Sequence, residues 1–138
     1  MKLEYKTASG QTDYETLADY TDVVREWQPN ATAKSQHDDL AVNPGEQNNN
    51  FRQPLGNIST KIALDLTVTK ADETTAAAFA RTTTRTLLGS KNHFKLTVGT
   101  EFQYYPNGIC TKCSFRLAGA TVEFNIDLET DLVTKTAP

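Results

Sequence analysis

The sequence predicts a single domain of the α+β class, mainly β, in which an antiparallel β-sandwich or half-barrel carries one flanking α-helix. Three observations support this fold class: strict alternation at residues 58–69, one helical segment at residues 71–88, and a succession of alternating segments after it. The 138 residues fit one domain, 1–138, with a core of ordinary size. We expect the last residues, 134–138, to form a short flexible tail.

The N-terminal third gives weaker signals. Residues 2–6 alternate, with Leu3 and Tyr5 on one face, which predicts a short first strand. Residues 23–35 predict another strand, interrupted at Pro29, and a proline places such a strand at a sheet edge or in an extended arm.

Residues 36–57 predict a long loop. They contain two prolines, two glycines and five asparagines, and few apolar side chains. Compact domains usually join their elements with about 4–6 residues, so a connection of this length needs a purpose. Three interpretations are open: a disordered segment, a ligand-binding loop, or an arm that becomes ordered against a neighbouring subunit.

The two longest alternating runs, at residues 58–69 and 121–133, predict strands with one apolar and one polar face. The first of them would span about 40 Å, whereas a strand usually has about 5–6 residues. The polar faces are net negative, which is typical of a solvated face or of a wall that repels a polyanion. The apolar positions include Ile62, Leu64, Leu66, Val122, Phe124 and Ile126, and the acidic positions are Asp65, Glu123, Asp127 and Glu129.

The helix at residues 71–88 is the only convincing helical segment. Thr69 or Asp72 can cap its first turn, and Gly89 is a stop signal at its end. Several threonines lower its intrinsic helix propensity, so packing against the sheet has to stabilise it. Its modestly apolar face consists of Ala76, Phe79, Ala80, Thr83 and Leu87.

The segment between the helix and the last strand predicts a meander. Residues 93–98 and 101–105 alternate, and the Asn-Gly pair in residues 106–108 predicts a hairpin turn. Residues 109–119 predict a further strand, with Cys113, Phe115 and Leu117 on one face.

Composition argues against several classes of function. The net charge is −3 and the pI about 5.3, whereas a protein that grips phosphate is usually basic. No apolar run is long enough to span a membrane, and the N-terminus lacks the apolar region of a secretory signal, so we expect synthesis in a cytoplasm. His37 and His93 stand outside any catalytic motif and there is no Gly-rich phosphate loop, so we expect no enzyme activity and no cofactor.

Two cysteines, Cys110 and Cys113, form a C-x-x-C motif. Such a pair occurs in redox motifs and in half of a zinc site, but a structural zinc site needs four ligands, and the two histidines are isolated in the sequence. Two reduced structural thiols are the favoured interpretation, and we expect no metal. Trp27, Tyr104 and Tyr105 could form a ligand platform, but core or interface aromatics are the better interpretation.

The order of elements resembles the tail-tube proteins of tailed bacteriophages and related contractile injection systems. The resemblance covers roughly residues 58–130: a long alternating strand, a helix, further strands, and a second long strand. It implies a virion protein, made in the bacterial host cytoplasm, whose copies form stacked and typically hexameric rings around an acidic lumen. DNA would pass through without specific binding, and the partners would be other tail proteins such as the tape measure, terminator and baseplate. Ring closure also removes the exposed edges of long strands.

The resemblance also implies roles for two groups of residues. The polar faces of the long strands would line the lumen, and residues 36–57 would be an arm that contacts a neighbouring subunit. The alternatives are a tail terminator or baseplate ring protein of the same fold, and a monomeric β-sandwich that binds a ligand through its loop. The lumen-facing residues would be Glu123, Asp127, Glu129 and Asp65, and the arm contacts would be Leu40, Val42, Phe51, Arg52 and Leu55.

Overall fold

The computed structural model describes residues 1–39 and 50–138, with the backbone alone described at 31–39 and 50–58. The described chain is mainly β and contains seven strands and one helix. The elements are β1 (Lys2–Thr7), β2 (Glu15–Ala18), β3 (Val23–Asp39), β4 (Asn50–Thr69), α1 (Glu73–Gly89), β5 (Asn92–Val98), β6 (Glu101–Ala118) and β7 (Thr121–Thr130).

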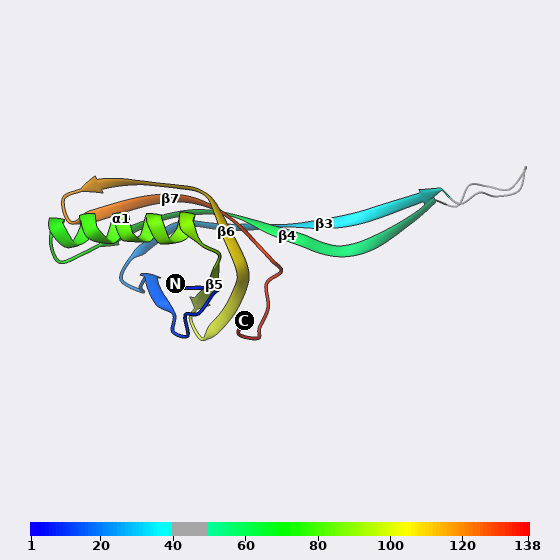
Figure 1. Ribbon diagram of the computed structural model, residues 1–138, viewed down its shortest axis with the longest axis horizontal. Coiled ribbons are helices and arrows are strands. Elements are labelled where there is room, and N and C mark those ends of the chain that lie inside the picture. Colours follow the sequence, from blue (N-terminus) through cyan, green and yellow to red (C-terminus); the bar gives the residue numbers. More distant parts are fainter. Residues whose placement is uncertain (40–49) are drawn as a thin grey trace, which may run out of the picture.

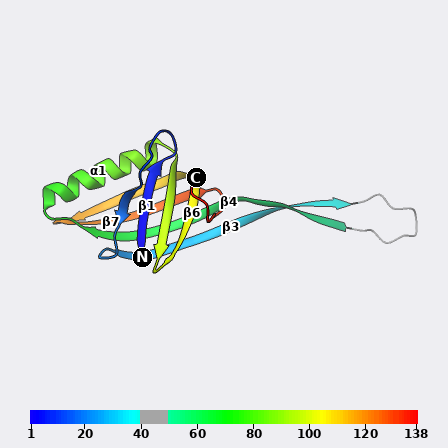
Figure 2. The same cartoon turned by 90° about the horizontal axis from the view of Figure 1, so that it is seen from below.

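All strand pairs are antiparallel, in the order β2-β1-β5-β6-β7-β4-β3. Strand β6 belongs to both halves of this order, because residues 101–108 pair with β5 and residues 109–118 pair with β7. We call β2, β1, β5 and the first part of β6 sheet A, and the second part of β6 with β7, β4 and β3 sheet B. The two halves enclose the core, with α1 alongside (Figures 1 and 2). The predicted fold class is confirmed.

Strand β6 bends where the sequence predicted a hairpin turn, and that prediction is wrong. Asn107 has a positive φ of 54°, but the chain continues into sheet B instead of reversing. Hydrogen bonds to residues distant in the sequence stabilise the bend. The Asp131 amide donates to the Pro106 carbonyl at 2.9 Å, and the Asn107 amide donates to His93 Nδ1 at 3.0 Å. An Asn-Gly pair supplies the required backbone conformation, but tertiary contacts decide whether it makes a turn or a corner.

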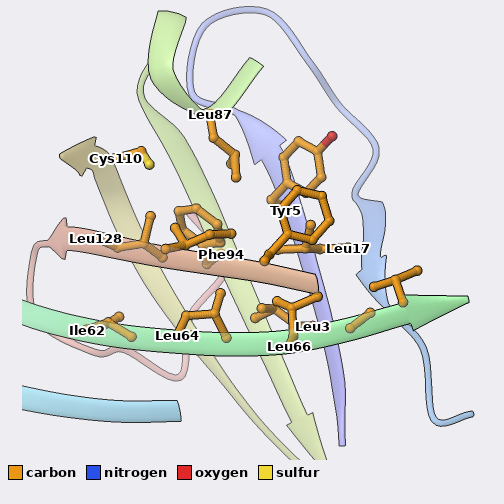
Figure 3. Close-up of a cluster of buried hydrophobic side chains, with 14 of the residues drawn as sticks. Leu3, Tyr5, Leu17, Ile62, Leu64, Leu66, Leu87, Phe94, Cys110 and Leu128 are labelled. Atoms are coloured by element: carbon orange, nitrogen blue, oxygen red, sulfur yellow. The ribbon is translucent and has the colours of Figure 1, made fainter. Parts of the chain in front are cut away.

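The core fills the space between the two sheets and the helix. Among the described side chains, the inward apolar positions of β4 and β7 are at most 2% exposed, which confirms the predicted apolar faces there. Sheet A contributes Leu3, Tyr5, Phe94 and Leu96 from the opposite side. Figure 3 shows Tyr5, Leu17 and Phe94 facing Leu64 and Leu66 across this core.

The helix α1 begins two residues later than the sequence predicted and ends one residue later, at Gly89. Asp72 is the N-cap, and its side chain accepts a hydrogen bond of 2.7 Å from the Thr75 amide. The helix packs against β6 and β7, and the Phe79 ring meets the Phe124 ring edge to face, with centroids 5.9 Å apart. The buried helix residues are Ala76, Ala80, Thr83 and Leu87, all on the predicted face.

The prediction of a long loop at residues 36–57 is wrong over most of its length. Residues 36–39 belong to β3 and residues 50–57 belong to β4, and the two strands pair with each other as far as Asp39 and Asn50. Composition misled the prediction because the ladder is built from backbone groups, which polar residues supply as well as apolar ones. Pro54 fits because β7 pairs with β4 only from Thr60 onward, so β4 is an edge strand in this region.

We call the paired segments at 31–39 and 50–59 the arm. It extends away from the two-layered body (Figures 1 and 2), and at about 3.3 Å per residue it adds roughly 30 Å to the molecule. Pro29 lies within β3, the last strand of sheet B, as the prediction of an edge strand required. At the other terminus, Thr134 exchanges two backbone hydrogen bonds of 2.9 Å with Tyr104.

Candidate assembly surface

Sheet B has two edges that no described strand covers. On one side, residues 109–118 of β6 pair with β7 but have no described strand on their other side. On the opposite side, β3 pairs only with β4. Unpaired edges of this length are unusual in a monomer, because their free N–H and C=O groups can pair with another chain.

The outer face of sheet B brings together the acidic residues predicted from sequence. In the pairing of β4 with β7, Asp65 lies opposite Asn125, and Glu123 is two residues away along β7. Asp127 and Glu129 continue the same face of β7, because alternate residues of a strand point to the same side. The sequence therefore located this face correctly from alternation alone.

Basic residues on the flanking strands neutralise one end of this face. Arg25 on β3 lies 2.7 Å from the Asp65 carboxylate and 3.9 Å from Glu123. Arg116 on β6 binds the Glu123 carboxylate through Nε and one terminal nitrogen, each at 2.8 Å. These pairs are solvent-exposed and contribute little stability, but they cancel charge on the face.

The other end of the outer face, next to the arm, keeps more of its negative character. Among the described side chains, Asp127 and Glu129 have no ion-pair partner within 4.0 Å, although Lys112 and Lys61 lie opposite them in the strand register. A hollow at this end of the face is lined by Lys61, Ala63, Asp127 and Glu129, among others. The face is therefore a mixture of charges with its unpaired carboxylates at one end.

The free edge of β6 exposes apolar side chains. Phe115 is 36% exposed and Leu117 39% exposed, and both lie on the side of β6 that faces α1, like Cys113. On the β3 edge, Val24 and Trp27 are partly buried against the core. Each edge thus carries apolar side chains on the inner side of the sheet. The outer side of each edge is mixed, because Val23 on β3 is 56% exposed and Ile109 on β6 is 49% exposed.

The predicted arm contacts lie only partly in the described region. Phe51, Arg52 and Leu55 belong to the arm segment of β4, opposite residues 34–38 of β3. Leu40 and Val42 lie outside the described residues.

The remaining candidates from the sequence are the two cysteines and the aromatic residues. Cys110 and Cys113 are free thiols, and no group of three potential metal ligands occurs in the described residues. Trp27 meets Tyr105 edge to face at 5.2 Å and both belong to the core region, so they form no open platform. In the described chain, no helix has the length and apolar character needed to cross a membrane.

Sequence reasoning missed Arg25 and Arg116, the two residues that neutralise carboxylates on the outer face. The prediction considered the polar faces of the two long strands and not their neighbours in the sheet. Arg116 could have been found from the alternation of residues 109–119. Arg25 could not, because a β-bulge between Val24 and Glu26 shifts the register there.

No protein-family model matches the sequence, and no curated protein matches it. The fold, in contrast, has counterparts among solved structures. One is a chain of the tail of an empty gene transfer agent particle with C6 symmetry, at 15% identity and a TM-score of 0.54, covering 99% of this chain and 95% of that one.

Two further counterparts belong to baseplates. A chain of the phage p2 baseplate in its activated conformation has 15% identity and a TM-score of 0.56, over 97% of this chain and 44% of that one. A chain of the anti-feeding prophage baseplate has 11% identity and a TM-score of 0.54, over 96% and 89%. The protein therefore has the fold found in these tail and baseplate chains, which confirms the fold that the resemblance implied.

Proposed function

We propose that this protein is a structural subunit of a phage tail tube, whose copies join edge to edge into rings that stack around a lumen. The observation that carries this proposal is the open sheet B, with an unpaired edge on β6 and another on β3. Pairing the β6 edge of one copy with the β3 edge of the next satisfies both edges at once.

Strand directions support this arrangement. Because the four strands of sheet B alternate in direction, β6 and β3 run in opposite directions. Copies related by a rotation would therefore meet in an antiparallel pair and continue the pattern of the sheet. Such a head-to-tail contact generates a closed ring when the rotation closes.

The number of copies and the lumen are further parts of this proposal. The similar gene transfer agent tail has C6 symmetry, so we propose six copies per ring. The outer face of sheet B would line the lumen, where Asp127 and Glu129 repel the DNA backbone while Arg25 and Arg116 balance the other carboxylates. DNA would pass without specific binding, and the partners in the virion would be other tail proteins.

The arm fits a role between subunits. Its two strands pair only with each other among the described residues, so nothing in the described chain covers them. A two-stranded hairpin alone is marginally stable in water and gains stability by packing against something else. We propose that this partner is a neighbouring subunit, in the same ring or in the next.

Electron microscopy and native mass spectrometry of the purified protein test the assembly. We expect hexameric rings or tubes for the natural chain. Leu117→Lys, which places a charge at the β6 edge, should abolish rings and leave a chain that still unfolds cooperatively in urea, because Leu117 is 39% exposed. Leu132→Lys is the matched control, since Leu132 is 40% exposed and lies outside both edges. A natural chain that stays monomeric at high concentration would refute the proposal.

A shortened chain tests the arm separately. Replacing residues 34–56 by Asn-Gly should leave a folded domain, because Ala33 and Asn57 are already paired across the hairpin. We expect this variant to unfold cooperatively like the natural chain and to lose stacked tubes. Tubes of normal length would show that the arm has no role in assembly.

A ring protein of the baseplate or a tail terminator is the second candidate. The observation that favours it is the similarity to two baseplate chains, at TM-scores of 0.56 and 0.54. A tube subunit polymerises beyond one ring, whereas a baseplate or terminator protein stops at a single ring. The length distribution of the particles in the same micrographs separates the two.

A further inference from the structure

The two open edges of sheet B carry matching apolar side chains. On β6, Phe115 and Leu117 lie on the inner side of the sheet and are 36% and 39% exposed. On β3, Val24 and Trp27 lie on the same inner side, because each pairs with a buried leucine of β4. Each edge therefore offers two apolar side chains to a strand that pairs with it.

The outer side of the same edges carries opposite charges. Arg116 on β6 binds Glu123 through Nε and one terminal nitrogen, while 75% of its side chain stays exposed. Glu26 on β3 is exposed, and among the described side chains it has no ion-pair partner within 4.0 Å. Its neighbour Arg25 is already paired with Asp65 at 2.7 Å. A guanidinium has five N–H donors, so Arg116 can bind a second carboxylate.

One antiparallel register of β6 against the β3 of a second copy joins all of these residues. In an antiparallel pair, a residue one position later on one strand faces a residue one position earlier on the other, and opposed side chains share a face. The count passes over Arg25, which is the extra residue of the β-bulge on β3. The register opposes Phe115 to Trp27 and Leu117 to Val24 on the inner side, and Arg116 to Glu26 on the outer side.

Registers shifted toward the start of β3 lose the apolar contacts. A shift of two residues keeps each side chain on its face, so the competing registers differ in steps of two. With Ser114 opposite Glu26, Leu117 lies beyond the first residue of β3. With Lys112 opposite Glu26 the charges still match, but Phe115 lies beyond that end as well.

The register with Ser114 opposite Glu26 has a second defect. Within one copy these two residues already lie in a single row across sheet B, through Asn125 and Asp65. Opposing them between copies would therefore join successive copies without any stagger. A sheet that closes into a barrel needs a stagger between its strands, so this register does not suit a ring.

A register shifted the other way loses the ion pair. With Ala118 opposite Glu26, Arg116 faces Gln28, which carries no charge. Val24 then lies beyond the last residue of β6 and has no partner on that strand. Of the registers in steps of two around it, only the one with Arg116 opposite Glu26 matches both the charges and the two inner apolar pairs.

We propose that copies of this chain join in this register, and that Arg116 and Glu26 are the residues that select it. The inference rests on the proposed function, because it specifies the contact between neighbouring copies of a ring. Arg116 binds Glu123 of its own chain and Glu26 of the next, so the ion pair bridges the two copies. Phe115 and Leu117 are covered by the same contact.

Pairs of introduced cysteines measure the register without altering Arg116 or Glu26. Directly opposite residues have Cβ atoms about 4.5–5.5 Å apart, close enough for a disulfide after small shifts, whereas residues two positions away are about 7–8 Å apart. The proposed register opposes Ser114 to Gln28, so Ser114→Cys with Gln28→Cys should form covalent multimers when rings are mildly oxidised and run on a denaturing gel without reductant. The matched controls report the two neighbouring registers and should give at least tenfold less product: Lys112→Cys with Gln28→Cys, and Ser114→Cys with Asn30→Cys.

A mixing experiment tests the two charged residues. Arg116→Glu alone opposes two carboxylates at every contact, and Glu26→Arg alone opposes two arginines, so each variant should need at least tenfold more protein to form rings. An equimolar mixture should recover rings, because alternating copies restore an opposite charge at every contact. Native mass spectrometry should then find equal numbers of the two chains in each ring. Normal rings from either variant alone, or no recovery in the mixture, would overturn the role of this pair.

The two experiments also separate this inference from the proposed function. If the natural chain forms rings but a control pair of cysteines cross-links best, the register is wrong and the ring function stands. If the natural chain forms no rings by electron microscopy, the proposed function fails and the register fails with it. Cross-linking of the Ser114 and Gln28 positions in rings of the natural size supports both.

Discussion

The corner of β6 gives the sharpest test of how this fold is built, through the substitution Gly108→Ala. Gly108 is buried at the point where β6 leaves sheet A for sheet B, and it pairs with Asn92 of β5. A Cβ at this position would lie 2.6 Å and 2.9 Å from two carbons of the Phe94 ring, and 2.9 Å from the Asn92 carbonyl oxygen. The added Cβ would therefore clash with both a side chain, Phe94, and a backbone atom, the Asn92 carbonyl oxygen.

The magnitude follows from what can move. Phe94 is completely buried and packs against the Tyr5 ring, with centroids 6.5 Å apart, so its ring cannot shift freely. The Asn92 carbonyl belongs to the strand backbone, and moving it disturbs the pairing with β6. Overpacking of a core usually costs about 1–3 kcal/mol, and we expect about 3 kcal/mol here because neither neighbour is a flexible side-chain end.

Urea unfolding measures this change. With a slope of about 1.5–2 kcal/mol per molar, a loss of about 3 kcal/mol lowers the midpoint by roughly 1.5–2 M. Gly89→Ala is the matched control, because it adds the same methyl group at the end of α1, where nothing lies within 4 Å. We expect the control to be neutral or to stabilise by up to about 1 kcal/mol.

A double-mutant cycle identifies the contact responsible. Phe94→Leu removes ring carbons that the new Cβ would meet, so Gly108→Ala should cost at least about 1 kcal/mol less in that background. A midpoint shift of less than about 0.5 M for Gly108→Ala alone would refute the reasoning, because it would mean that β6 can bend without this close approach.

Three further predictions concern charge and hydrogen bonding. Burial, and then Lys6, lowers the pKa of His93 below its ordinary value of 6.5. The neutral ring, which accepts a hydrogen bond from the Asn107 amide, therefore stabilises the fold above pH 6.5, and this stabilisation is lost as the pH falls through the pKa of the folded state. His93→Gln should reduce the loss of unfolding free energy between pH 7 and pH 5. Asp72→Ala should lower the melting temperature by removing the N-cap of α1, and Asp72→Ser, which keeps an acceptor, should restore most of it. Asp127→Lys should raise the affinity of assembled rings for duplex DNA by roughly tenfold or more at low salt, and Asp13→Lys, an equal charge change away from sheet B, should not; equal effects in a filter-binding assay would remove Asp127 from the lumen.

The sequence determined the faces of the long strands and the position of the helix. Alternation at residues 58–69 and 121–130 required one buried and one polar side, and the structure buries the predicted apolar positions, Ile62 and Phe124 among them. The helix was predictable because its cap, its apolar face and its stop signal are local features of the chain. Each of these signals depends on residues within a few positions of one another.

Only the tertiary structure decided how the strands are joined. The Asn-Gly pair at Asn107 has the local signature of a hairpin, yet contacts with His93 and Asp131 make it a corner within one strand. Residues 36–39 and 50–57 have the composition of a loop, yet they pair as an arm, because a backbone ladder depends on a partner strand and not on side-chain type. Bulges near Arg25 and Thr111 likewise changed which side chains share a face.

One physical reason separates the features that the sequence determined from those that the tertiary structure decided. Periodicity, capping and turn propensity are properties of neighbouring residues, so the sequence alone determined the fold class, the core faces and the outer acidic positions. Pairing, bending and register depend on contacts between residues far apart in the chain. Only the three-dimensional structure therefore decided which edges of sheet B stay open, which arginines neutralise its carboxylates, and which cysteine is only partly buried at its edge.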